Sequence, residues 1–406
     1  MGIKQLFGKD MLGLWTRDLA ITTLAVFFMR FGEGILNGAR MNFFVDTLGI
    51  TGGQVLWLEG IREVPGLLLI FVAALTMRLP LSRRAVSAAL ILGLGYMSFA
   101  LVQSYTGLLA AAVAASFGLH IYQPIGPALG LALATGRTRG RVLGLLASVG
   151  SLAGIAGIGV LALTSNLTRN APPDALRWYY VVGGAIVALS ALFFWRLSPK
   201  LGATDQEQPR MVVKRRYWRF YLLKFFEGSR KEILGSFCLL VLVDFFGWGV
   251  WQTSTLLLIA SVLSMVISPY LGAAVDRFGA KISLAVSYAI LALAAVGYAL
   301  IPNPMILAVI YIVIRMAHIL NLGLNVYAHE RAPAEELNPT LAAGVSFDHV
   351  SSVGMPFIFG AMMAATGNYT HVYWLAAVLI AISVVFVLRM QSGHEPQPAQ
   401  ELALAE

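Results

Sequence analysis

Charged residues are scarce in this chain of 406 residues, making up 12% of it, whereas hydrophobic residues make up 58%. Soluble domains carry about 25% charged residues, so this composition excludes a soluble enzyme. Cysteine is nearly absent, and the single Cys238 excludes a disulfide scaffold and a cysteine-only zinc site. The sequence also lacks the phosphate-binding pattern G-x-x-x-x-G-K-[ST], so we expect no nucleotide-driven pump and no cofactor.

Long apolar runs are what the chain has instead. A membrane-spanning helix needs about 20 mostly apolar residues, and we draw twelve such stretches. Their approximate bounds are 19–45, 53–77, 85–103, 107–135, 140–163, 177–197, 219–243, 250–273, 281–301, 305–328, 338–365 and 371–390. The sequence therefore predicts an all-α membrane protein with twelve transmembrane helices.

A polar segment divides these stretches into two sets of six. We expect an N-terminal six-helix bundle over residues 1–197, a cytoplasmic linker over 198–218, a C-terminal six-helix bundle over 219–390, and a disordered cytoplasmic tail over 391–406. Lys and Arg collect in one set of loops, and the opposite set carries only Arg169 and Arg177. Cytoplasmic loops retain such an excess, so we expect both termini in the cytoplasm of a bacterial-type cell whose inner membrane holds the chain. The net charge of +9 then reports topology and does not predict binding to nucleic acid.

The two sets of helices match each other at an offset of 198 residues. Val45, Asp46 and Gly49 fall on Val243, Asp244 and Gly247, and the same offset pairs Phe27 with Phe225, Gln54 with Gln252 and His120 with His318. Transporter folds are commonly duplicated in this way. We therefore expect two pseudo-symmetric halves.

The loop after the eighth predicted span reads Gly272-Ala-Ala-Val-Asp276-Arg277-Phe-Gly279-Ala-Lys281. It resembles the loop signature of the major facilitator superfamily (MFS), and the stretch Arg139-Gly-Arg141-Val-Leu-Gly144 is also similar to that family. The resemblance implies the MFS fold and a gating role for Gly272, Asp276, Arg277, Gly279 and Lys281. The matching loop of the first half, residues 74–84, lacks the Asp and the second Gly.

Ionisable and amide side chains inside the predicted spans are the candidates for substrate binding. They are Arg30, Asn37, Arg230, Lys231, Arg315 and Asn321. Charge is expensive inside a bilayer and usually marks a cavity or a relay. Since the basic residues outnumber the acidic ones, we expect a small substrate that is anionic or zwitterionic, with arginine contacting carboxylate or phosphate.

A second group of side chains is suited to proton transfer. It comprises Glu33, His120, His318, Asp348 and His349. Histidine changes charge near neutral pH, and an acid beside basic residues can be released from its pair when a proton arrives. We expect H+ to be the coupling ion.

Some of these charges have a plainer interpretation, because residues three or four apart on a helix can form ion pairs. We apply it to Glu59, Arg62 and Glu63, and it is open for Arg30 with Glu33 and for Glu227 with Lys231. The main hypothesis is a monomeric secondary active transporter surrounded by membrane lipid, which moves its solute by alternating access. A proton-coupled exporter of lipophilic drugs is the alternative, and an intramembrane enzyme or a receptor is less favoured.

Overall fold

The computed structural model describes residues 15–68, 79–134, 138–168, 170–202 and 213–390. Within these ranges the chain forms helices and no strand. Nine of the described helices are long and apolar enough to cross a membrane. The predicted all-α class is confirmed, whereas the count of twelve spans stays a prediction.

Four of the predicted spans do not correspond one to one with described helices of spanning length. Two of them, 250–273 and 281–301, lie on α11 (Val250–Leu300), where Gly279 has a φ of 77° that breaks the helical geometry between them. The third begins with the charge-rich helix α9 (Trp218–Glu232), which contains five charged residues between Lys224 and Glu232. The fourth corresponds to α3 (Gly52–Leu67), and the remainder of that predicted span includes residues 69–78, which lie outside the described ranges.

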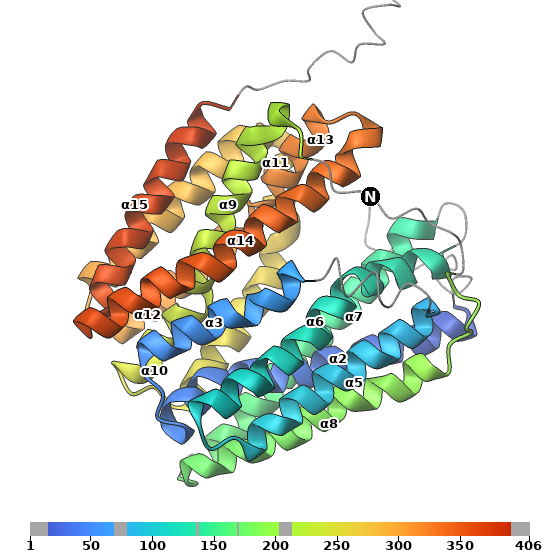
Figure 1. Cartoon of the computed structure of the whole chain (residues 1–406), viewed down its shortest axis with the longest axis horizontal. Coiled ribbons are helices and arrows are strands. Elements are labelled where there is room, and N and C mark those ends of the chain that lie inside the picture. Colours follow the sequence, from blue (N-terminus) through green and yellow to red (C-terminus); the bar gives the residue numbers. More distant parts are fainter. Residues whose placement is uncertain (1–14, 69–78, 135–137, 169, 203–212, 391–406) are drawn as a thin grey trace, which may run out of the picture. The chain divides into compact units, whose positions relative to one another are not determined.

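By packing, the chain divides into two compact units. Unit 1 comprises Met1–Gly49, Val64–Asp205 and Gly249–Leu258. Its helices are α2 (Arg17–Asn42) with the π-helical continuation η2 (Phe43–Thr47), α5 (Leu81–Ser98), α6 (Tyr105–Leu133), α7 (Arg139–Leu167) and α8 (Leu176–Trp195). Helix α2 packs against α7 and α8, and α5 packs against α6 and α8 (Figure 1).

Unit 2 comprises Ile50–Glu63, Gln206–Trp248 and Ile259–Glu406. It holds the start of α3, then α9, η7 (Ile233–Phe237), α10 (Cys238–Asp244), most of α11, α12 (Pro304–Ile319), α13 (Leu322–Arg331), α14 (Ala334–Thr366) and α15 (Tyr369–Leu388). Helix α9 packs against α14 and α15 (Figure 1). The segment η7 is a five-residue π-helical turn that joins α9 to α10 without a break in the helix.

Two of the domain predictions concern residues that the structure leaves undescribed. The tail over 391–406 lies outside the described ranges, and so do residues 203–212 of the linker. The division into two bundles at that linker therefore stays a prediction.

The offset of 198 residues is visible in the backbone of the two halves. Gly49 and Gly247 both have positive φ values, 61° and 66°. Each is followed by a glutamine whose Oε1 accepts a hydrogen bond from the backbone N–H three residues earlier, at 2.9 Å for Gln54 and 2.7 Å for Gln252. Equivalent residues thus begin equivalent helices, which supports the predicted duplication.

A cluster around Glu336 joins the start of α9 to the start of α14. The Glu336 carboxylate accepts hydrogen bonds from Lys214 Nζ at 2.8 Å, from the Tyr217 hydroxyl at 2.8 Å and from Arg216 Nη2. Burial raises the pKa of Tyr217 to about 12, and the hydrogen bond to Glu336 acts in the same direction. Tyr217 therefore stays protonated and continues to donate over the physiological pH range.

Glycine allows the close approach of α2 and α7 in unit 1. A Cβ at Gly157 would lie 2.1 Å from the carbonyl oxygen of Phe31, and one at Gly34 would lie 2.3 Å from that of Gly154. Both obstacles are backbone atoms, which cannot turn aside as a side chain can. Gly144 of the same helix has nothing within 4 Å of the equivalent position. The glycine content of the fifth predicted span is thus required for packing at some positions and not at others.

We expect the Gly157→Ala variant to be less stable than the wild type by about 1–3 kcal/mol, because the added methyl group forces α2 and α7 apart. The Gly144→Ala variant is the matched control and should unfold at the wild-type temperature or slightly above it. The measurement is the thermal unfolding midpoint of the purified full-length protein in detergent. Equal midpoints for the two variants would contradict the packing argument.

Candidate functional site

In unit 1, two of the three predicted site residues on α2, Arg30 and Glu33, form an ion pair with each other. Arg30 Nη1 donates to Glu33 Oε2 at 2.8 Å, with the Arg30 side chain 45% exposed and the Glu33 side chain 8% exposed. Asn37 is exposed on the same helix. The spacing of three residues therefore gives an intrahelical ion pair, as one of the two interpretations predicted.

His120 of α6 is buried, and its Nδ1 hydrogen-bonds the carbonyl oxygen of Ser116 at 2.9 Å. Its counterpart in the repeat is His318 of α12, which is half-buried. The repeat therefore preserves the identity of these histidines on equivalent helices, while their degree of burial differs.

A cavity of about 380 Å³ lies within unit 2. Helices α9, α12 and α14 and the segment η7 contribute its described walls, which are Lys224, Glu227, Lys231, Leu234, Gly235, Arg315, His318, Val345 and Asp348. Four of the predicted site residues, Lys231, Arg315, His318 and Asp348, thus come together around one space. A volume of this size is at the small end of the range for ligand pockets, about 300–1,000 Å³.

The two lysines of the cavity already have carboxylate partners. Lys224 Nζ lies 2.8 Å from Glu227 Oε2 on the same helix. Lys231 Nζ lies 2.8 Å from Glu63 Oε2, which belongs to α3. In place of the ion pair considered between Glu227 and Lys231, Glu227 pairs with Lys224 and Lys231 pairs with Glu63.

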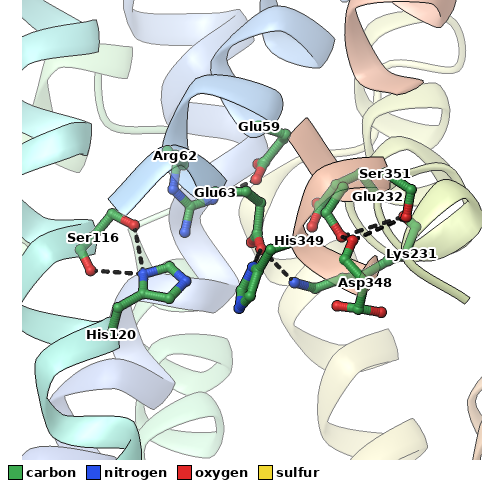
Figure 2. A network of polar contacts seen from close by, with 12 residues as sticks. Glu59, Arg62, Glu63, Ser116, His120, Lys231, Glu232, Asp348, His349 and Ser351 are labelled. Atoms are coloured by element: carbon green, nitrogen blue, oxygen red, sulfur yellow. Dashed lines mark hydrogen bonds and ion pairs between the residues drawn. The ribbon is translucent and has the colours of Figure 1, made fainter. Parts of the chain in front are cut away.

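Glu63 also holds a histidine. Its Oε2 lies 3.1 Å from His349 Nδ1 on α14, so one carboxylate joins α9, α3 and α14 (Figure 2). The other charges of this predicted span behave as expected, since Arg62 donates to Glu59 within α3. For Glu63 the intrahelical interpretation is wrong, because its partners are on other helices.

Arg315 and Asp348 differ from the lysines. Within the described ranges, neither the Arg315 guanidinium nor the Asp348 carboxylate has an opposite charge within 4.0 Å. Asp348 lies on the same side of the network as Lys231 and His349 (Figure 2). Lys231, Glu227, Lys224 and His349 act on its charge only at longer range. Among the described lining residues, Arg315 and Asp348 are thus a cation and a carboxylate without a direct partner of opposite charge.

Two further predicted residues lie outside the cavity lining. Arg230 is only 2% exposed, and its guanidinium carbon lies 3.8 Å from the centre of the Tyr288 ring, while Nη1 lies 3.5 Å from Ser383 Oγ. Asn321 is also buried; it accepts a hydrogen bond from Ser287 Oγ at 2.9 Å and donates to Glu227 Oε1 at 3.4 Å. Asn321 thus fixes the carboxylate that holds Lys224.

The predicted gating residues lie along α11. Asp276 and Arg277 are exposed, and the Arg277 guanidinium carbon lies 5.4 Å from the Phe278 ring centre. Gly279 has a positive φ of 77° with a ψ of 166°, a conformation that favours glycine and interrupts the helix, between Gly272 on one side and Lys281 on the other. Their role in gating stays a prediction.

Three charged residues at the site were absent from the predicted set, namely Glu63, Lys224 and Glu227. Lys224 and Glu227 share one helical face with Lys231, at spacings of three and four residues, and that periodicity is the sequence signal for them. Glu63 has no comparable signal, because its partners are 168 and 286 residues away in the chain.

The contact between Arg230 and Tyr288 allows an experiment that tests what stabilises the buried Arg230 cation. No described carboxylate lies within ion-pair distance of Arg230, so the aromatic face is its main electrostatic support. In a cycle of Arg230→Met, Tyr288→Leu and the double variant, we expect a coupling energy of about 1–2 kcal/mol. The readout is the free energy of unfolding in detergent.

Arg230→Met alone should leave that free energy unchanged or raise it, because an apolar side chain avoids the cost of burying a cation. A coupling energy near zero would show that the arginine is supported by other groups.

The comparison with protein families identifies a match to the Major Facilitator Superfamily over residues 22–353. No curated protein sequence matches the chain. Among solved structures, the nucleoside transporter NupG aligns with a TM-score of 0.75 at 12% identity, covering 93% of this chain and 100% of that one.

Two other kinds of transporter are similar in structure. A bacterial homolog of the human lysosomal transporter Spinster, in an inward-facing and unoccupied conformation, gives a TM-score of 0.71 at 14% identity, covering 91% of this chain and 95% of that one. A POT family transporter in complex with a thioalcohol-conjugated peptide gives 0.73 at 10% identity, covering 92% and 96%. Identities this low show a shared fold alone. With a family match that spans most of the chain, this multi-pass membrane protein belongs to the Major Facilitator Superfamily and has its transporter fold.

Proposed function

We propose that this protein is a secondary active transporter that moves a small solute with an anionic group by alternating access, driven by a proton gradient. The observation that carries the proposal is Arg315, a cation in the wall of the cavity with no direct carboxylate partner among the described residues. A guanidinium presents several N–H donors in a planar fork that fits carboxylate or phosphate. A solute anion would supply the partner that the chain itself does not.

The lysines of the cavity are less suited to this task than Arg315. Lys224 and Lys231 each have a carboxylate at 2.8 Å, so a solute would compete with an existing ion pair. Arg230 is buried and is not part of the described lining of the cavity, so it would add positive potential without touching the solute. Arg315 is therefore the residue on which we place recognition of the anion.

Proton coupling is supported by the carboxylates that hold basic groups. Glu63 keeps Lys231 and His349 together, and Glu33 holds Arg30. Adding a proton to such a carboxylate removes its charge and weakens its hold on the cation. We propose that Glu63 with His349 in unit 2, and Glu33 in unit 1, carry the coupling protons.

Export of lipophilic drugs is the competing function. Mutual pairing of Arg30 with Glu33 and of Lys231 with Glu63 favours it, because paired charges do not attract an anion. The described lining of the cavity argues against it, since Leu234, Gly235 and Val345 are its only apolar members and no aromatic or methionine side chain joins them.

For the location and topology of the chain, we propose the inner membrane of a bacterial-type cell with both termini cytoplasmic, on the basis of the Lys and Arg bias.

We expect Arg315→Gln to abolish uptake of organic anions by the protein reconstituted in liposomes, because glutamine cannot neutralise the anion. Substrates for the assay come from a thermal-shift panel of organic anions and lipophilic cations, since a ligand that binds only the folded state raises the unfolding midpoint. Arg389→Gln removes an exposed arginine at the end of α15 and should leave uptake unchanged. Unaltered anion uptake by Arg315→Gln would reject the anion proposal, and stabilisation by lipophilic cations alone would favour drug export.

We expect Glu63→Gln to separate transport from the proton gradient. The amide cannot release a proton, so accumulation driven by a pH gradient should fall at least about tenfold, while exchange of labelled for unlabelled solute continues. Both fluxes are measured on the same proteoliposomes. Glu335→Gln, at an exposed carboxylate of α14, is the control; equal loss of exchange and accumulation in Glu63→Gln would indicate a structural role instead.

A further inference from the structure

The geometry of the unit 2 cavity points to a zwitterionic solute. We propose that Arg315 contacts the anionic group of the solute and that Asp348 contacts its cationic group. This inference rests on the proposed function, and it narrows the class of solute from anions in general to molecules that carry both charges.

The argument begins with the charges that the cavity neutralises by itself. Lys224 is matched by Glu227, and Lys231 is matched by Glu63, each at 2.8 Å. These two pairs contribute no net charge to the space between the helices. What is left on the described part of the lining is one positive group on α12, Arg315, and one negative group on α14, Asp348. A solute of one sign would satisfy one of them and face repulsion from the other.

Asp348 is well placed to receive a cation. The hydroxyls of Ser351 and Ser352 donate to the backbone carbonyl of Asp348, at 2.9 Å and 2.8 Å, and not to its carboxylate. The ammonium group of Lys231, which acts on Asp348 at longer range, is directed to Glu63 (Figure 2). Its carboxylate oxygens therefore retain capacity for further hydrogen bonds.

Both charged groups are accessible on the cavity lining, since Arg315 is exposed and Asp348 is half-buried. The described chain supplies no direct partner of opposite charge for either residue, so both are open to a solute. A zwitterion would supply both partners at once. Its two ends would also fix its orientation, with the remainder of the molecule against Leu234, Gly235 and Val345.

The size of the cavity limits the molecule further. A space of about 380 Å³ accommodates a solute of amino-acid size, whereas pockets for larger ligands extend to about 1,000 Å³. The chemical class is therefore a small molecule with a carboxylate, or a similar oxyanion, and an ammonium group.

The experiment compares three charge forms of one side chain. The probes are L-leucine, N-acetyl-L-leucine and L-leucinamide, which are a zwitterion, an anion and a cation, and the series is repeated with phenylalanine and glutamine. Dissociation constants are measured on the purified full-length protein in detergent. In at least one series we expect the zwitterion to bind at least about tenfold more tightly than both single-charge forms.

Two variants then assign each charge. Asp348→Asn removes the partner of the ammonium group, so the dissociation constant of the zwitterion should rise at least about tenfold. It also removes the group that repels an anion, so the dissociation constants of the zwitterion and the N-acetyl form should become similar. Arg315→Gln should have the mirror effect and bring the zwitterion close to the amide form. The controls Glu335→Gln and Arg389→Gln should bind all three probes as the wild type does. A loss caused only by misfolding would weaken all probes equally and would not reproduce these opposite patterns.

The outcomes separate this inference from the function on which it rests. If N-acetyl forms bind and are transported as well as the zwitterions, and Asp348→Asn changes neither, the zwitterion inference is wrong and the anion transporter stands. If lipophilic cations bind while none of the probes does, both are wrong. Absence of binding by every probe in all three series would likewise overturn the inference.

Discussion

Charge inside an apolar helix bundle is costly unless an opposite charge accompanies it, and the way this chain meets that constraint determines the character of its cavity. Glu63 is the clearest case, since one carboxylate serves Lys231 and His349 and so connects three helices of unit 2. If an apolar residue replaced Glu63, Lys231 would lose its ion-pair partner and would be a third unpaired charge on the described cavity lining. The charged groups available to a solute are therefore those that the protein has not already paired with one another.

Much of the fold was predictable because it depends on local patterns. Apolar runs of spanning length and the match at 198 residues are properties of the sequence alone, and the structure repeats them in Gly49 and Gly247 and in the glutamines that follow. The break within α11 falls at Gly279, between the predicted spans 250–273 and 281–301, so the sequence also predicted where these two helices separate.

The site was predictable in part for the same reason. Spacing on a helix places Lys231 and Arg315 among apolar residues, but it does not say what they face. Arg230 looks equivalent to its neighbour in sequence, yet it is buried against Tyr288, because adjacent helical residues point about 100° apart. Pairing was beyond sequence reasoning wherever it joined distant segments, as Glu63 does. The offset of 198 also failed to predict these differences, since it relates backbones better than it relates side-chain environments.

The π-helical turn η7 (Ile233–Phe237) separates the charged face of α9 from the apolar helix α10. Its residues Leu234 and Gly235 reach the cavity wall. A π turn holds more residues than an α turn, so side chains after the turn point in directions rotated from those that a regular α-helix would give them. The lysines of α9 can therefore face a polar space while the helix that follows keeps Cys238 to Val243 buried. The helix stays continuous, so no loop exposes backbone to lipid.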